Sequence, residues 1–266
     1  MMATFHIDEG GRWGGRLTSR PLPDQDEEIE RLSEDEREGI ANVWLGRAAT
    51  ERRVSESFVV IRDALRALHA DGERLRLAER AIDDELRHAE ICRYVASRFH
   101  GSELPPPPEL PLVVPRLEGA SEELRRTLHV VGQCSLNETT ASAFLEACCD
   151  GARCELAQAA LRELLSDEID HARIGWMHLA SVSGDIRASV GRLLLPLARE
   201  NLRMWRQASR SSGWTGAYAA HGAPSAAVIE DALVCAIRDL IIPGFALLKI
   251  PVAPVEAWVA NGAPTE

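Results

Sequence analysis

Asp84-Glu85-Leu86-Arg87-His88 is the most informative segment of this sequence, because its pattern returns 83 residues later as Asp167-Glu168-Ile169-Asp170-His171. On an α-helix a glutamate and a histidine three residues apart share one face, so each copy can offer a carboxylate and an imidazole to one metal ion. A lone Glu-x-x-His is common by chance. The interpretation therefore depends on whether both copies lie on inward faces and each has a glutamate on a partner helix.

Before the first copy, the sequence predicts a long helix that begins after Ser33, where Glu36 completes a capping-box pattern, and ends at Asp71-Gly72. Its apolar residues recur at three- and four-residue spacing. They are Trp44, Val54, Phe58, Ile61, Leu65 and Leu68. Glu51 falls on this stripe and is the predicted ligand. Glu56 lies near the opposite face and would replace it if the register were shifted.

The helix that carries the first copy has an apolar stripe with one glutamate set into it. The stripe is Leu75, Ala78, Ile82, Glu85, Ala89, Cys92, Ala96 and Phe99. An outward-facing Glu85 on a solvated surface is the alternative, but it would leave a gap in the apolar row. We therefore expect Glu85 and His88 to face the interior.

A proline-rich segment, residues 100–120, separates this pair of helices from the next pair. About 15 residues of polyproline conformation span roughly 45 Å, about the length of a 28-residue helix. The segment is thus interpreted as a crossover along a bundle, with a domain linker as the alternative.

A third helix is predicted to start near Ser121, and its stripe again contains one glutamate, Glu138. After a turn at Asp150-Gly151, the fourth helix carries Glu168 and His171, both on its apolar stripe. Glu51 precedes Glu85 by 34 residues and Glu138 precedes Glu168 by 30, as expected for two antiparallel hairpins with their ligands level. The sequence predicts two half-sites that face each other.

The remaining regions complete an all-α prediction. Residues 1–32 are Gly-rich and then acidic and are expected to form an extended arm, residues 33–184 the bundle, and residues 185–266 a helical extension packed on it. Two more helical segments are expected at about 186–209 and 226–248, with Pro243-Gly244 kinking or ending the second. The apolar stretch 241–260 either covers the bundle or forms a subunit contact, as in a homodimer.

The composition of the chain disfavours some classes of function. The chain has 266 residues, 45% of them hydrophobic, and a net charge of -11, which disfavours nucleic acid as a partner. No secretory signal and no long apolar span occurs in the sequence, so we expect no membrane association. Six cysteines that fall mostly within helical patterns suit a reducing, cytoplasmic compartment.

Four carboxylates and two imidazoles suit a particular kind of metal site. Two divalent ions about 3.5 to 4 Å apart need carboxylates between and around them. Calcium and magnesium sites do not need histidine, and zinc sites normally have fewer ligands. Two iron ions, or manganese or a mixed pair, fit best. The predicted ligands are Glu51, Glu85, His88, Glu138, Glu168 and His171.

This set resembles the ferritin-like diiron-carboxylate superfamily, in which two helices give one glutamate each and two give a Glu-x-x-His. The resemblance covers about residues 40–182 and implies a ferritin-like four-helix bundle with a long crossover between its second and third helices. Asp84 to His88 is also similar to the Asp-Glu-x-Arg-His of bacterial multicomponent monooxygenase hydroxylases. The second copy departs from that pattern, since Asp170 replaces the arginine.

The same resemblance implies roles for neighbouring residues. Asp84 and Asp167 would orient the imidazoles, although surface acids are the alternative. Ser142, one turn after Glu138, would lie near a dioxygen pocket or be a small core residue. Ribonucleotide-reductase-like proteins place a tyrosine where this chain has Cys92, so radical chemistry of that kind is not expected.

The implied activity is that of an enzyme, a non-heme diiron oxidoreductase. It would use dioxygen to hydroxylate, N-oxygenate or desaturate a small organic substrate, with an external electron donor. Three alternatives stay open: a ferroxidase or peroxide-detoxifying ferritin-like protein, a manganese catalase-like protein, and a bundle in which metal serves only stability.

Overall fold

The computed structural model describes residues 18–19, 22–23, 26–115, 118–211 and 216–264, and its regular secondary structure there is entirely helical. The longer elements are α2 (Glu34–Ala67), α3 (Gly72–His100), α4 (Glu122–Val130), η1 (Val131–Glu138), α5 (Thr139–Gly151), α6 (Glu155–Ser181) and α7 (Gly184–Ser211). The shorter elements are α1 (Glu27–Glu30), η2 (Ala219–His221), α8 (Ala226–Ala236), η3 (Ile237–Ile241), α9 (Ile242–Leu247) and α10 (Ala253–Ala260). The all-α prediction is confirmed for these residues.

Helix starts follow their capping residues. Ser33 and Glu36 form the predicted capping box, and the side chain of Ser121 caps α4. The first long helix ends earlier than predicted, at Ala67, and Asp71 instead caps α3, where it accepts a hydrogen bond from the Arg74 backbone N–H. The Asp71-Gly72 signal therefore marks a helix start, and the prediction that it ends the first helix was wrong.

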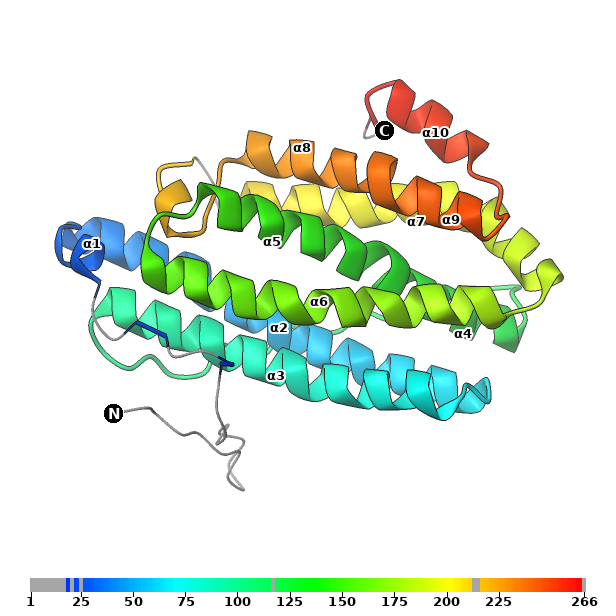
Figure 1. Ribbon diagram of the computed structural model, residues 1–266, viewed down its shortest axis with the longest axis horizontal. Coiled ribbons are helices and arrows are strands. Elements are labelled where there is room, and N and C mark those ends of the chain that lie inside the picture. The colour runs from blue at the N-terminus through cyan, green and yellow to red at the C-terminus, as the bar shows by residue number, and fades with distance from the viewer. Residues whose placement is uncertain (1–17, 20–21, 24–25, 116–117, 212–215, 265–266) are drawn as a thin grey trace.

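Four helical rods lie side by side along the length of the molecule: α2, α3, the continuous rod α4–η1–α5, and α6 (Figure 1). α2 packs on α3, α3 on α6, α6 on η1 and α5, and α4 on α2. Each rod runs antiparallel to the neighbours it contacts (Figure 1). The four rods thus close a ring around a shared interior.

The proline-rich segment connects opposite ends of this ring. Residues 103–115 have no regular secondary structure and lie between the end of α3 and the start of α4. These two ends lie at opposite ends of the rods (Figure 1). The path is that of a crossover along the helices, as the length of the segment suggested.

The buried apolar side chains form two clusters. One includes Trp44 on α2, Val95 on α3 and Leu161 on α6, and it extends into α7–α10. The other includes Phe58 on α2 and Ala78 on α3. On α2, α3 and α6 the predicted ligands fall in sequence between the residues of the two clusters.

Most of the predicted N-terminal arm, residues 1–17, 20–21 and 24–25, lies outside the described residues. In the described part, residues 27–30 form the short helix α1, capped by Asp26. Asp26 also accepts hydrogen bonds from the Cys154 thiol at 3.0 Å and the Leu156 backbone at 3.3 Å. These contacts dock α1 on the start of α6.

The C-terminal third packs on the ring. α7 contacts η1 and α4, and α8 contacts α5. Of the kink or end expected at Pro243, the end does not occur, because α9 follows directly on the π-helical η3. Pro243 occupies the first turn of α9, where a missing N–H costs no internal hydrogen bond. Phe245, Ile250 and Trp258 are buried, so the apolar stretch 241–260 covers the other helices. No helix in the described ranges combines the length and apolarity needed to span a membrane.

Candidate metal centre

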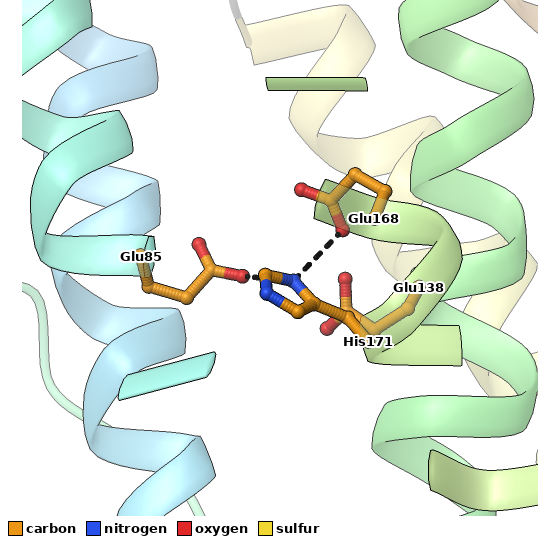
Figure 2. Close-up of side chains that lie close together, drawn as sticks. All are labelled: Glu85, Glu138, Glu168 and His171. Carbon is orange, nitrogen blue, oxygen red and sulfur yellow. Dashed lines mark ion pairs between the residues drawn. The ribbon is translucent and has the colours of Figure 1, made fainter. Parts of the chain in front are cut away.

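Two pairs of side chains face each other across the interface between α3 and α6. Glu85 and His88 on α3 are completely buried, and Glu168 and His171 on α6 are 3% and 1% exposed. The three-residue spacing places each glutamate and histidine on one helix face. Glu85 and His171 extend toward each other from opposite helices, with Glu168 and Glu138 beside them (Figure 2).

The potential ligands fall into two groups that share Glu85. One group is Glu85, Glu138, Glu168 and His171, and the other is Glu51, Glu85 and His88. Within each group the ligand atoms all lie within 4.8 Å of one another. The six residues proposed from the sequence therefore lie together inside the bundle, and this buried group could bind metal.

Both imidazoles present Nδ1 to the interior carboxylates. His171 Nδ1 lies 3.1 Å from Glu85 Oε1 and 3.4 Å from Glu168 Oε2. His88 Nδ1 lies 3.7 Å from Glu85 Oε2 and 3.7 Å from Glu168 Oε1. Glu85 and Glu168 each lie between the two imidazoles, which is the position expected of carboxylates that bridge two ions, whereas Glu51 and Glu138 lie at the outer sides.

The other nitrogen of each imidazole faces an aspartate on the opposite helix. His88 Nε2 lies 3.1 Å from Asp167 Oδ2, and His171 Nε2 lies 3.5 Å from Asp84 Oδ2. An Nε2–H that points at an aspartate leaves the Nδ1 lone pair free for a metal ion. Each aspartate thus lies beside the outer nitrogen of the imidazole on the opposite helix, which is the position that the role implied by the resemblance requires.

Two arginines of α3 hold these aspartates. Arg87 pairs with both Asp84 and Asp167. Arg80 lies 3.0 Å from Asp84, 3.6 Å from Asp167 and 2.9 Å from Asp170. The aspartates of the second motif copy therefore pair with arginines of α3, so this copy needs no arginine of its own. This is a physical reason why Asp170 stands where the first copy has Arg87.

On α2 the structure distinguishes the two candidate glutamates. Glu51 lies with Glu85 and His88, whereas Glu56 is exposed to solvent. Part of the Glu51 side chain also reaches solvent. The group around Glu51 is thus the more open of the two.

Glu138 ends the π-helix η1 and is held by two amides. Its Oε1 accepts hydrogen bonds from Gln133 Nε2 and, at 3.4 Å, from Asn137 Nδ2. Gln133 Oε1 accepts from Ser57 Oγ on α2 at 2.8 Å, and Asn137 Oδ1 accepts from Trp205 Nε1 on α7 at 3.1 Å. Hydrogen bonds between residues five apart define a π-helix and bring Gln133 round to Glu138, which an α-helix would not do.

Without metal, the outer carboxyl groups favour protonation. Burial and the neighbouring Glu85 raise the pKa of Glu51 well above its usual value. Burial and the neighbouring carboxylates do the same to the pKa of Glu138. Burial would also raise the pKa of Glu85, but the nearby imidazoles of His171 and His88 outweigh burial and lower the pKa to about 2.

Without metal, both imidazoles also favour the protonated form. Burial alone would lower the pKa of His88, but its contacts with Asp167 and Glu85 outweigh burial and raise the pKa to about 10. The pKa of His171 is raised well above its usual value by contacts with Asp84 and the interior glutamates, again against the effect of burial. Metal binding must therefore displace protons from the site.

Unpartnered buried atoms also indicate that these residues fit metal ions. Several buried atoms that face the interior have no hydrogen-bond partner in the described structure, and such atoms cost free energy unless something satisfies them. They are both Oε atoms of Glu85, Nδ1 of His88, Oε2 of Glu168 and Nδ1 of His171. Carboxylate oxygens with imidazole nitrogens suit first-row ions such as iron and manganese.

Ser142 and His178 make ordinary structural contacts. Ser142 donates its hydroxyl to the backbone oxygen of Glu138 at 2.9 Å. His178 is buried and lies 3.1 Å from the Thr127 hydroxyl, and burial and the charge of Arg74 lower its pKa to about 4.

Sequence reasoning missed Arg80, Gln133 and Asn137. Arg80 lies one turn before Asp84, a spacing at which an ion pair could have been proposed. Gln133 gave no such signal, because on an α-helix residues five apart do not share a face. Comparison with protein-family models, with curated proteins and with solved structures finds no match.

Proposed function

We propose that this chain is a ferritin-like dinuclear iron enzyme that uses dioxygen to oxidise a small organic substrate. The observation that supports it most is the position of Glu85 and Glu168 between two imidazoles whose Nδ1 atoms face them. Four carboxylates carry the charge needed to balance two divalent ions. The four-rod ring with a long crossover supports the ferritin-like assignment.

The proposed chemistry favours iron over metals that lack accessible redox states. When bound, a pair of iron ions supplies the electrons that dioxygen must receive before it can oxidise an organic molecule. An external donor would then restore the reduced state. Manganese fits the same donors and remains the second candidate metal.

The chain's own residues position and shield this chemistry. Asp84 and Asp167 hold the imidazoles in the tautomer that turns Nδ1 inward. The fully buried Phe58 ring lies 5.1 Å from the His171 ring and excludes water on that side. Glu138 has Oε1 occupied by the amides, so Oε2 is the atom it would offer to an ion.

The test is to load the protein anaerobically with ferrous iron, expose it to oxygen, and record absorbance and oxygen uptake. We expect uptake of about one dioxygen per pair of ions, faster than ferrous iron in buffer, and no such uptake by Glu85→Ala. Uptake at the buffer rate would contradict the proposal. Rapid disproportionation of hydrogen peroxide by the manganese form would favour the catalase-like alternative instead.

A further inference from the structure

Arg47 is a buried cation one helical turn before Glu51 on α2. Its side chain is 8% exposed. The guanidinium carbon lies 4.5 Å from the centre of the Trp44 ring and 5.4 Å from that of Phe144. Nη2 donates to the backbone oxygen of Gly222 at 3.1 Å and approaches the Cys148 sulfur at 3.7 Å. Nη1 has no hydrogen-bond partner.

Two other arginines with little exposed surface are paired with carboxylates. Arg74 lies 3.1 Å from Asp71, and Arg87 pairs with Asp84 and Asp167. Arg47 has no ion pair with any carboxylate in the part of the chain that the structure describes. An arginine cannot lose its proton in a protein, so burial without a counter-charge is costly.

Arg47 lies on the side of the bundle where the metal centre is more open. Arg47 lies four residues before Glu51 on α2, and the buried Cys92 lies four residues after His88 on α3, so each is one helical turn from a candidate ligand and on the same helix face. An anion at Arg47 would therefore lie beside the candidate metal centre.

The balance of charges at the metal centre and Arg47 also favours a bound anion. The four ligand glutamates carry four negative charges, and two divalent ions would neutralise them. The positive charge of Arg47 is then left over in a low-dielectric interior, where charges are poorly screened. A bound anion would supply the missing charge. A guanidinium pairs with carboxylates and with phosphates, and a carboxylate brings the single negative charge that balances Arg47.

We propose that Arg47 anchors the acid group of an organic carboxylate, which is the substrate class of this enzyme. The inference rests on the proposed function, since it names the class of substrate for the oxidation proposed there. Arg47 thus recognises the substrate and takes no part in the reaction itself.

The experiment uses the manganese(II)-loaded protein, in which binding can be measured without oxygen chemistry. Acetate and benzoate are titrated while heat or tryptophan fluorescence is recorded, with acetamide and benzamide as uncharged counterparts. Arg47→Met should weaken binding of the carboxylates about 10- to 100-fold, the effect of losing a charge-assisted hydrogen bond. Arg52→Met, on the same helix but in a surface pair with Glu109, should leave it unchanged.

Equal carboxylate affinity in wild type and Arg47→Met would overturn the inference, because the probes would then bind the ions directly. Failure of both carboxylates to bind wild type better than the amides would also overturn it, and this comparison holds if Arg47→Met does not fold. Arg47→Lys keeps the charge and should retain part of the affinity. Oxygen reactivity without carboxylate binding would refute this inference alone, whereas binding without oxygen reactivity would refute the proposed function alone.

Discussion

The two halves of the candidate metal centre use the same kinds of ligands but hold them differently. The first half-site is Glu51, Glu85 and His88, and the second is Glu85, Glu138, Glu168 and His171, so Glu85 belongs to both. In the first, both helices are regular and Glu51 is partly open to solvent. In the second, Glu138 is 2% exposed, ends a π-helix and is held by two amides.

This difference indicates that the two ions would not be equivalent. A ligand fixed by its neighbours loses little freedom on binding, so the second half-site should hold its ion more tightly. The more open first half-site, next to Arg47, is then the place where an exogenous molecule can approach. Similar ligand residues can thus form two sites of different affinity when the surrounding helices differ.

The largest expected effect comes from the ligand that both half-sites share. Glu85→Ala should lower metal content from about two ions per chain to below about half an ion, because both groups lose a carboxylate. Elemental analysis after reconstitution measures this. Glu56→Ala, which removes an exposed glutamate of α2, is the matched control and should keep both ions.

Removing one outer glutamate should separate the half-sites. We expect Glu51→Ala to lose the weaker of two manganese(II) binding steps in a calorimetric titration and Glu138→Ala to lose the tighter one, leaving about one ion per chain in each case. Loss of the same step in both variants would show that the halves are equivalent.

The metal-free protein should become less stable as pH rises. His88, whose pKa is raised from 6.5 to about 10, binds more protons folded than unfolded, so its contribution is present below pH 6.5 and lost toward pH 10. The raised pKa values of His171, Glu51 and Glu138 act in the same direction, those of the glutamates from about pH 4.5 upward. We expect His88 alone to lower the free energy of unfolding by about 2 to 4 kcal/mol between pH 6 and pH 9, and the other three groups to add to this loss.

Denaturant unfolding at several pH values, with and without metal, measures this dependence. The metal-loaded protein should be less sensitive, because its ligands are already deprotonated. Below about pH 4 the trend should reverse, since Glu85, Asp84 and Asp167 have lowered pKa values and lose their stabilising charge there. Metal-free stability that rises between pH 6 and pH 9 would contradict these protonation states.

The aspartates that orient the imidazoles should have an intermediate effect. Asp167→Asn should weaken metal binding about 10- to 100-fold through His88, and Asp84→Asn should do so through His171. Competition with a metal chelator measures the change. If neither substitution alters affinity, the aspartates serve only the surface network with Arg80 and Arg87.

The smallest expected effect comes from removing one of the two side-chain amides that donate hydrogen bonds to Glu138. Gln133→Leu should weaken the tighter ion by less than about tenfold and leave the other unchanged, because Asn137 still holds Glu138. The same titration detects it. A change in the weaker step alone would contradict the assignment of Glu138 to the tighter site.

Helical periodicity carried most of the information that the sequence offered. The inward faces of α3 and α6 could be predicted because Glu85 and Glu168 each fill a place in an apolar stripe. The helix starts could be predicted because Ser33 and Ser121 satisfy backbone amides locally. These features depend on residues three or four apart.

What could not be predicted depends on departures from that period or on contacts between distant residues. The π-helix before Glu138 changes which residues share a face, so Gln133 was missed. Periodicity also could not decide between a kink and an end at Pro243, which follows the π-helical η3 and lies in the first turn of α9. Arg80 reaches Asp170 across 90 residues, a pairing that follows only from how α3 packs on α6.

The most direct test of the account is the metal content of the purified protein after reconstitution with ferrous iron under anaerobic conditions, measured beside Glu85→Ala. About two irons per chain are expected in the wild type and almost none in the variant. Little or no bound metal in the wild type, with iron or with manganese, would contradict it and leave the buried carboxylates and imidazoles without a partner.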